Sequence, residues 1–139
     1  MMDVLCSDKK PRHLLGIGSL DDIIFSVKQG VDTFDCINPM RFARMGQTYI
    51  SHDYSLQKFE KLKMNDYLLD ITKTKHKYDL SPLDPDCHCS TCTTFSRAFL
   101  HHLFKQRELS VYRYLTIHNL YFMEKFFEEI RSAIKNNEL

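Results

Sequence analysis

The chain has 139 residues, of which 43% are apolar and 27% charged, and its formal net charge is +1. This is the length of one domain, and its near-neutral charge excludes a wholly basic nucleic-acid-binding surface. No apolar run approaches the ~20 residues of a transmembrane helix, and we expect no secretory signal in the first residues. We therefore expect a cytoplasmic protein without a membrane partner, in which clustered cysteines favour metal binding or catalysis over disulfides.

A strand, a helix and a second strand are predicted in the N-terminal third of the chain. The first strand covers residues 13–18 and is expected to be buried. Ser19 is placed to cap the helix, with Asp22 in a capping-box position, and Gly30 is placed to end it. The second strand covers 31–37. Tight glycine junctions around one helix are typical of a parallel βαβ unit.

An acidic residue stands near the carboxyl end of the second predicted strand. Asp35 therefore occupies the edge where α/β folds build active sites. Arg41 and Arg44 follow in an expected loop over 39–44, and guanidinium groups suit phosphate oxygens. Asp35 is a candidate nucleophile or base for chemistry at a sugar-phosphate. The alternative is a salt-bridge network among Asp35, Arg41 and Arg44.

The middle of the chain predicts extended segments. A strand is expected over 46–51, and one or two strands over 67–78, while 55–64 is ambiguous between helix and loop. Three lysines at alternate positions would share one side of the extended chain: Lys73, Lys75 and Lys77. They would either keep a sheet edge free of added strands or contact phosphate.

Three cysteines lie within six residues, at positions 87, 89 and 92. Thiols this close cannot easily form unstrained disulfides, but they can converge on one cation. Three cysteines and one histidine are a common set of tetrahedral zinc ligands. Four histidines are candidates for the fourth position: His88, His101, His102 and His118. Their spacing favours His118, with His102 second.

Two helices are predicted after the cysteines, over 94–107 and over 111–135. The second carries an apolar stripe at steps of three and four residues, formed by Leu120, Met123, Phe127, Ile130 and Ile134. Such a stripe predicts a core or interface face. Glu128 and Arg131 are spaced to form an ion pair on the same helix.

The order of these segments resembles the tRNA-guanine transglycosylase family (queuine tRNA-ribosyltransferases). The matching stretches are HLLGIG at 13–18, GVDTFDC at 30–36, PMRFARMG at 39–46, PLD at 82–84, CHCSTC at 87–92, SRAFLHHL at 96–103, HN at 118–119 and IR at 130–131. The resemblance implies an α/β fold: the C-terminal fragment of a TIM barrel, with a zinc-binding insertion and a long C-terminal helix. We expect a disordered lead-in over 1–10, the last strand–helix units over 11–46, and a zinc-binding subdomain with C-terminal helices over 47–139.

The resemblance also implies roles for individual residues. Asp35 matches the nucleophile that attacks C1′ of a flipped-out anticodon guanosine in tRNA, forming a covalent intermediate before a queuosine-type base enters. Arg41 and Arg44 match residues that bind the RNA backbone. Four residues match the ligands of a structural Zn²⁺: Cys87, Cys89, Cys92 and His118.

The chain departs from the family in length and in base recognition. A TIM barrel typically needs ~250 residues, and the portion with a second catalytic carboxylate has no counterpart here. His13 stands where the family usually has tyrosine, and Leu15 where it usually has methionine.

We therefore predict that this chain alone is inactive. Activity would need a separate chain that supplies the N-terminal half of the barrel, or a homo-oligomer. The alternative is a non-catalytic, zinc-stabilised module that binds RNA or protein. Without its barrel neighbours, the first unit should expose four apolar side chains: Ile23, Ile24, Val27 and Phe34.

Overall fold

A computed structural model describes residues 10–51 and 67–139, so the expected lead-in, except Lys10, and segment 55–64 lie outside the described residues. The elements in chain order are β1 (His13–Leu14), α1 (Leu20–Lys28), β2 (Thr33–Phe34), α2 (Asn38–Arg44), β3 (Gln47–Tyr49), β4 (Leu68–Asp70), the 3₁₀ helix η3 (Thr74–His76), α4 (Ser90–Thr94), α5 (Arg97–Lys105) and α6 (Leu109–Lys135). Across these two ranges, the helices lack the combination of length and apolar character needed to cross a membrane.

Strands β1 and β2 come before and after α1 in the chain and pair in parallel with each other, which confirms the predicted βαβ unit. The first strand is shorter than predicted, because only His13 and Leu14 belong to it. It is also not buried, since the neighbouring Leu15 is 72% exposed. Among the described residues the parallel sheet has two strands, so a barrel is not formed there.

Of the two signals predicted for the ends of α1, the one at its start was wrong and the one at its end was confirmed. Ser19 occupies the N-cap position, but its hydroxyl bonds to the Asp22 carboxylate and caps no backbone N–H, so the predicted capping box is wrong. At the other end Gly30 adopts φ +84° and donates its N–H to the Val27 carbonyl at 2.9 Å. Gly30 therefore ends the helix as predicted, because glycine adopts this left-handed conformation without a steric penalty.

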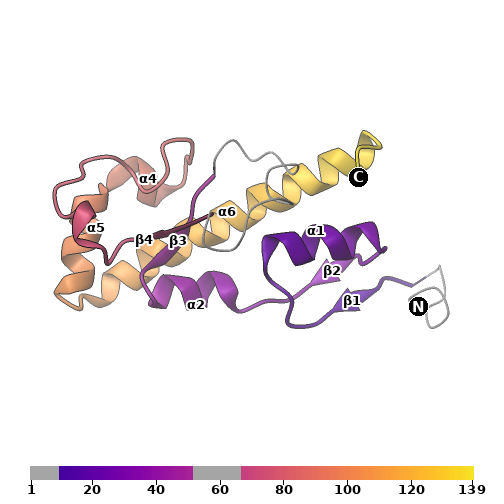
Figure 1. The fold of residues 1–139 in the computed structure, drawn as a ribbon, viewed down its shortest axis with the longest axis horizontal. Helices are drawn as coiled ribbons and strands as arrows, with labels where there is room; N and C mark the ends of the chain where they lie inside the picture. Colours follow the sequence, from indigo (N-terminus) through magenta and orange to yellow (C-terminus); the bar gives the residue numbers. More distant parts are fainter. Residues whose placement is uncertain (1–9, 52–66) are drawn as a thin grey trace.

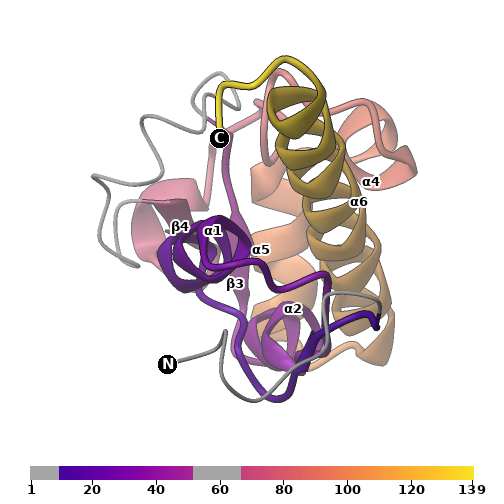
Figure 2. The same cartoon turned by 90° about the vertical axis from the view of Figure 1, so that its right-hand side faces the viewer.

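Helix α6 runs along the length of the structure and packs against several other elements (Figure 1). Its first half runs beside α2 and α5, and its second half passes over α1. Figure 2, viewed close to the α6 axis, shows α1 and α2 on one side of this helix and α4 on another. Side chains of α6 therefore enter two cores, one with α1 and one around the cysteines.

The buried face of α6 differs from the predicted apolar stripe. Met123 and Ile130 are buried as expected, but Leu120 and Ile134 are 50% and 49% exposed. The residues that face the protein interior are Val111, Leu115, His118, Asn119, Phe122, Met123, Phe126, Ile130 and Ala133. The predicted stripe was wrong because the buried face includes two polar residues, His118 and Asn119. A search for apolar residues at helical spacing does not detect them.

The ion pairs on α6 also differ from the prediction. Glu128 pairs with Lys125 at 2.6 Å and not with Arg131. Arg131 instead lies 3.9 Å from Glu124. Both pairs are solvent-exposed, so they contribute little to stability.

The apolar side of α1 is covered by α6, and not by barrel neighbours. Leu20, Ile23 and Ile24 are buried in one cluster with Phe122 and Phe126 of α6. The expected exposure of Ile23 and Ile24 is therefore wrong. Val27 and Phe34 were also expected to be exposed, and they are partly buried against this cluster.

Strand β4 pairs antiparallel with β3, so each of the two predicted extended segments contains a strand. The chain then leaves the sheet, because the Asp70 carboxylate accepts hydrogen bonds from the backbone N–H (2.9 Å) and hydroxyl (2.6 Å) of Thr72. This side-chain turn is followed by η3. The predicted row of Lys73, Lys75 and Lys77 on one extended strand is therefore wrong.

Gly46, between α2 and β3, offers a test of this packing. Its φ is +76°, and an added Cβ would lie 2.7 Å from a Thr72 methyl and 2.9 Å from the Phe104 ring. We expect Gly46→Ala to lower the free energy of unfolding in urea by about 2–3 kcal/mol. Gly16→Ala is the control, because its φ is +72° but nothing lies within 4 Å of the new Cβ, so it should cost only about 1 kcal/mol. Equal losses would show that packing around Gly46 does not contribute.

Candidate metal centre and catalytic carboxylate

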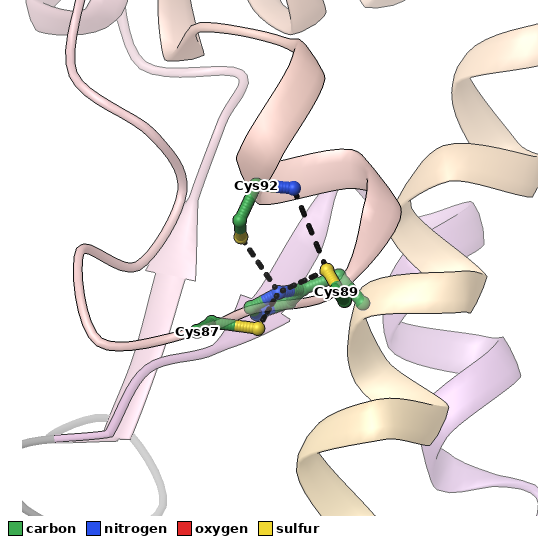
Figure 3. Close-up of side chains that lie close together, drawn as sticks. Cys87, Cys89 and Cys92 are labelled. Carbon is green, nitrogen blue, oxygen red and sulfur yellow. Dashed lines mark hydrogen bonds between the residues drawn. The ribbon is translucent and has the colours of Figure 1, made fainter.

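The three clustered cysteines converge on one point. Cys89 is the N-cap residue of α4, and its sulfur accepts the backbone N–H of Cys92 at 3.5 Å. Figure 3 shows the sulfur atoms of Cys87, Cys89 and Cys92 turned toward a common centre. All three side chains are buried, so their sulfur atoms are shielded from water.

His118 of α6 completes this cluster, whereas His102 is exposed on α5 and takes no part in it. The His118 Nδ1 lies close to all three sulfur atoms, at 3.5 Å from Cys87, 3.7 Å from Cys89 and 3.2 Å from Cys92. Its other ring nitrogen, Nε2, is 2.7 Å from the Tyr49 carbonyl oxygen, to which it donates when Nδ1 is a metal ligand.

The four side chains fit a tetrahedral metal ion. Their ligand atoms all lie within 4.8 Å of one another, and every residue is buried. Zinc bonds of about 2.3 Å to sulfur and about 2.0 Å to nitrogen place these ligand atoms about 3.5 Å apart in a tetrahedron. The observed sulfur–nitrogen distances of 3.2–3.7 Å match this spacing. The group is therefore able to bind a metal.

The electrostatics of the cluster also suit a cation. Burial lowers the pKa of His118, but hydrogen bonds to Cys87 and Cys89 outweigh it and raise the pKa to about 10. Hydrogen bonds with Cys87 and Cys92 lower the pKa of the Cys89 thiol, and those with Cys87 and Cys89 raise the pKa of Cys92. The buried centre thus stabilises negative charge on the Cys89 sulfur, and a bound metal would displace the protons held by the other ligands.

The loop before the cysteines is held by a buried carboxylate. One Asp84 oxygen accepts the backbone N–H and the hydroxyl of Ser51, both at 2.8 Å. The other carboxylate oxygen of Asp84 accepts the backbone N–H of Asp86 at 3.1 Å. The backbone carbonyl of Asp84 accepts the N–H of Cys87 at 3.2 Å. Asp84 therefore connects the end of the β3 segment to the first cysteine.

Arg97 holds the same loop from α5. Its guanidinium donates to the Leu83 carbonyl at 2.7 Å and to the Asp79 carboxylate at 3.2 Å. Hydrogen bonds from Ser81 and Arg97 lower the pKa of Asp79, with the Ser81 hydroxyl contributing most. The helix predicted over 94–107 is α5, but it begins at Arg97 and not at Thr94, because Ser96 caps it by accepting the Phe99 N–H at 3.2 Å.

Two adjacent residues of α6 fasten the metal centre to strand β3. While His118 contacts the Tyr49 carbonyl, Asn119 accepts the Tyr49 N–H at 3.1 Å. The Asn119 amide donates to the carbonyls of Pro39 at 2.9 Å and Gln47 at 3.2 Å. Asn119 is buried, and its amide joins α6 to both α2 and β3. Position 119 was part of the HN match, but its role depends on these distant partners.

Asp35 follows β2 directly, at the carboxyl end of the parallel pair. Its side chain is 62% exposed, and one oxygen, Oδ1, accepts the Gly16 N–H at 2.8 Å. The same oxygen lies 3.8 Å from Nε2 of His13, whose Nδ1 is 2.8 Å from the Thr33 hydroxyl. Its second oxygen has no hydrogen-bond partner in the ranges 10–51 and 67–139. This arrangement orients a carboxylate and leaves one oxygen open to solvent.

Arg41 and Arg44 lie on helix α2, not in a loop as predicted. Pro39 near the start of α2 explains the difference, because proline is compatible with the first helical turn. Among the described residues neither arginine forms an ion pair with Asp35, so the alternative salt-bridge network is wrong. Both guanidinium groups are exposed and available to a ligand.

Comparison with known proteins gives a consistent result. A family model described as queuine tRNA-ribosyltransferase matches residues 2–139. A queuine tRNA-ribosyltransferase of Aquifex aeolicus is 45% identical over 138 residues, covering 97% of this chain and 33% of the relative. One of Thermodesulfovibrio yellowstonii is 44% identical over 130 residues, covering 94% of this chain and 30% of the relative. The chain thus spans about a third of the length of these relatives.

Proposed function

Since the chain belongs to the queuine tRNA-ribosyltransferase family, as a C-terminal part of it, we propose that it carries the nucleophile and a structural zinc site of a tRNA-guanine transglycosylase. The observation that carries this proposal is the Asp35 carboxylate, held through one oxygen at the end of β2 and exposed at the other. The upstream part of the family fold would complete the barrel around it.

The reaction assigned to Asp35 is a double displacement at ribose C1′. The free carboxylate oxygen attacks C1′ of an extruded guanosine, and the bond from C1′ to the guanine nitrogen breaks. Guanine leaves with that electron pair and takes a proton from an acid supplied by the upstream part. The incoming base then attacks C1′ with its own nitrogen, loses a proton and releases the carboxylate. Two inversions retain the configuration, as in retaining glycosidases.

The Gly16 N–H supports this role by directing one Asp35 oxygen away from the reacting position. Arg41 and Arg44 on α2 would bind phosphates of the RNA around the reacting nucleotide. Since α2 begins three residues after Asp35, the rigid helix sets the distance between the nucleophile and these phosphate contacts.

Zinc would be held by Cys87, Cys89, Cys92 and His118. Four protein ligands leave no open coordination position, so the ion would supply folding free energy and no step of the reaction. Through His118 and the Tyr49 carbonyl, the site would hold β3 and, by way of Asn119, the neighbouring α2.

A second candidate is a non-catalytic, zinc-stabilised module that binds RNA or protein. The two-stranded extent of the parallel sheet in the described residues favours it, because the groups that recognise the guanine would come from other strands. For the same reason we expect this chain by itself to be inactive.

Exchange of labelled guanine into tRNA tests the proposal. This chain would be assayed alone and together with the preceding two-thirds of the Aquifex aeolicus relative. We expect no exchange alone, exchange in the complemented sample, and a loss of about a thousandfold or more in complemented Asp35→Asn. The matched control is Asp32→Asn, which removes an exposed carboxylate that accepts the Arg12 N–H at 2.7 Å, and should retain exchange.

Two results would contradict these expectations. Exchange by this chain alone would overturn its predicted inactivity. Undiminished exchange by complemented Asp35→Asn, or a denaturation-resistant tRNA adduct in that variant, would overturn the assignment of the nucleophile. Absence of exchange from the complemented wild type would favour the non-catalytic module.

A further inference from the structure

A groove lies between α2 and the first half of α6, which pack side by side (Figure 1). Its volume is about 340 Å³, within the range of small-molecule sites. The residues that line it are Met40, Arg44, Tyr112, Arg113, Thr116 and Ile117. Arg44 belongs to the predicted RNA contacts, whereas Arg113 comes from a part of the sequence to which no role was assigned.

The stretches of α2 and α6 that line this groove carry positively charged residues and no acidic ones. No acidic residue occurs over 38–51, and none occurs over 109–123. The nearest acids on α6 are Glu108 at its N-cap and Glu124 in its second half. Within the described chain, Arg44 and Arg113 form no ion pair with any of them. Two exposed guanidinium groups on one groove, without internal counter-ions, are complementary to an anion.

The groove is also lined by apolar and aromatic side chains. Tyr112 is half-buried and held edge-on against Phe104, with ring centroids 5.7 Å apart. Met40 and Ile117 add exposed or partly exposed aliphatic surface. Arginine and aromatic side chains in one groove are the combination by which proteins bind single-stranded nucleic acid, with phosphates on arginine and bases or sugars on the ring. An acidic peptide would use the arginines but not the aromatic ring.

Helix α2 connects the Asp35 segment to the groove, because Arg44 is the last residue of this helix. Helix α2 has seven residues and therefore spans about 10 Å from the end of the β2 turn to Arg44. This length corresponds to about three nucleotides stacked at about 3.4 Å each. A strand that presents one nucleoside to Asp35 would thus place a phosphate a few nucleotides away over the groove.

We propose that the α2–α6 groove binds a phosphodiester unit of the RNA strand, with Arg44 and Arg113 on the phosphate and Tyr112 beneath the adjoining sugar or base. The identity of the bound RNA strand rests on the proposed function, but binding of RNA in the groove does not require catalytic turnover. Arg113 is then an RNA-positioning residue contributed by the helix that also holds the metal centre.

The test is binding of a fluorescently labelled anticodon stem-loop RNA to the full chain across a salt series. We expect Arg113→Ala to raise Kd about fivefold at low salt and to reduce the slope of log Kd against log salt by about 0.7. Arg113→Lys should restore most of the slope, because it keeps the charge. The control is Arg131→Ala on the same helix, whose guanidinium lies 3.9 Å from Glu124 and which should bind like the wild type.

Three outcomes of the binding experiment would overturn the proposal. An unchanged Kd and slope in Arg113→Ala would remove the residue from the RNA interface, even if Arg41→Ala weakened binding. Equal losses in Arg113→Ala and Arg131→Ala would indicate general charge attraction. Displacement of the RNA by polyglutamate at equal charge concentration would show an anion surface without preference for nucleic acid. Failure of the guanine exchange assay would leave an Arg113-dependent RNA affinity intact, so the two proposals fail separately.

Discussion

Replacing His118 by alanine is expected to abolish stable zinc binding and to unfold the helices around the cysteines. The substitution removes the single ligand that joins the cysteine loop to α6 and leaves three buried thiols without a cation. Structural zinc supplies about 10–16 kcal/mol in small metal-dependent folds, which equals or exceeds the stability of a typical domain. The measurements are metal content by atomic emission and helical content by far-UV circular dichroism, with and without a chelator.

The control for this variant is His102→Ala, which removes the histidine that ranked second as a ligand. His102 is exposed on α5 and does not belong to the cluster, so metal content and helicity should remain those of the wild type. Cys89→Ser should behave like chelator treatment of the wild type. One equivalent of zinc retained by His118→Ala, or a wild-type spectrum unchanged by the chelator, would contradict the structural site.

Asn119→Leu is expected to cause the second-largest loss, of about 4 kcal/mol in the free energy of unfolding. Leucine has a similar volume but cannot accept the Tyr49 N–H or donate to the carbonyls of Pro39 and Gln47. Each buried polar group left without a partner costs about 1–3 kcal/mol. Urea unfolding of the zinc-loaded chain measures this difference.

Metal content separates this effect from that of the neighbouring ligand. Asn119→Leu leaves His118 and its contact with Tyr49 in place, so the variant should still bind zinc in a one-to-one ratio. Leu120→Ala is the control, because Leu120 is the next residue along α6 and is half exposed. A loss below about 1 kcal/mol in Asn119→Leu would mean that water or a backbone shift satisfies these groups in its place.

The local signals in the sequence were sufficient for the elements that depend on neighbouring residues. Gly30 ended α1 as predicted because only its own backbone conformation was involved. The spacing of Cys87, Cys89 and Cys92 indicated a metal site because one short turn brings the three sulfur atoms together. The βαβ unit followed for the same reason, since tight junctions leave the two strands few other ways to pair.

Predictions that depended on partners distant in sequence were wrong or incomplete. One error was local, since the alternating lysines did not share one face because Asp70 turns the chain out of β4 before Lys73. The apolar stripe on α6 omitted His118 and Asn119, which are fully buried and hydrogen-bonded to distant segments. No apolar period can identify such residues, because their burial is compensated by hydrogen bonds and metal ligation, not by hydrophobicity.

The sequence by itself determined the family, the parallel βαβ unit and a cluster of thiols suited to one metal ion. The resemblance already implied that His118 belongs to that cluster, and the structure places it there. Only the tertiary structure decided that Arg41 and Arg44 lie on a helix without internal counter-ions, and that Arg113 shares a groove with Arg44. The physical reason is the same in each case. Periodicity and spacing specify how a short segment folds, whereas the packing of α6 against β3 and α2 brings together side chains that are about 70 residues apart.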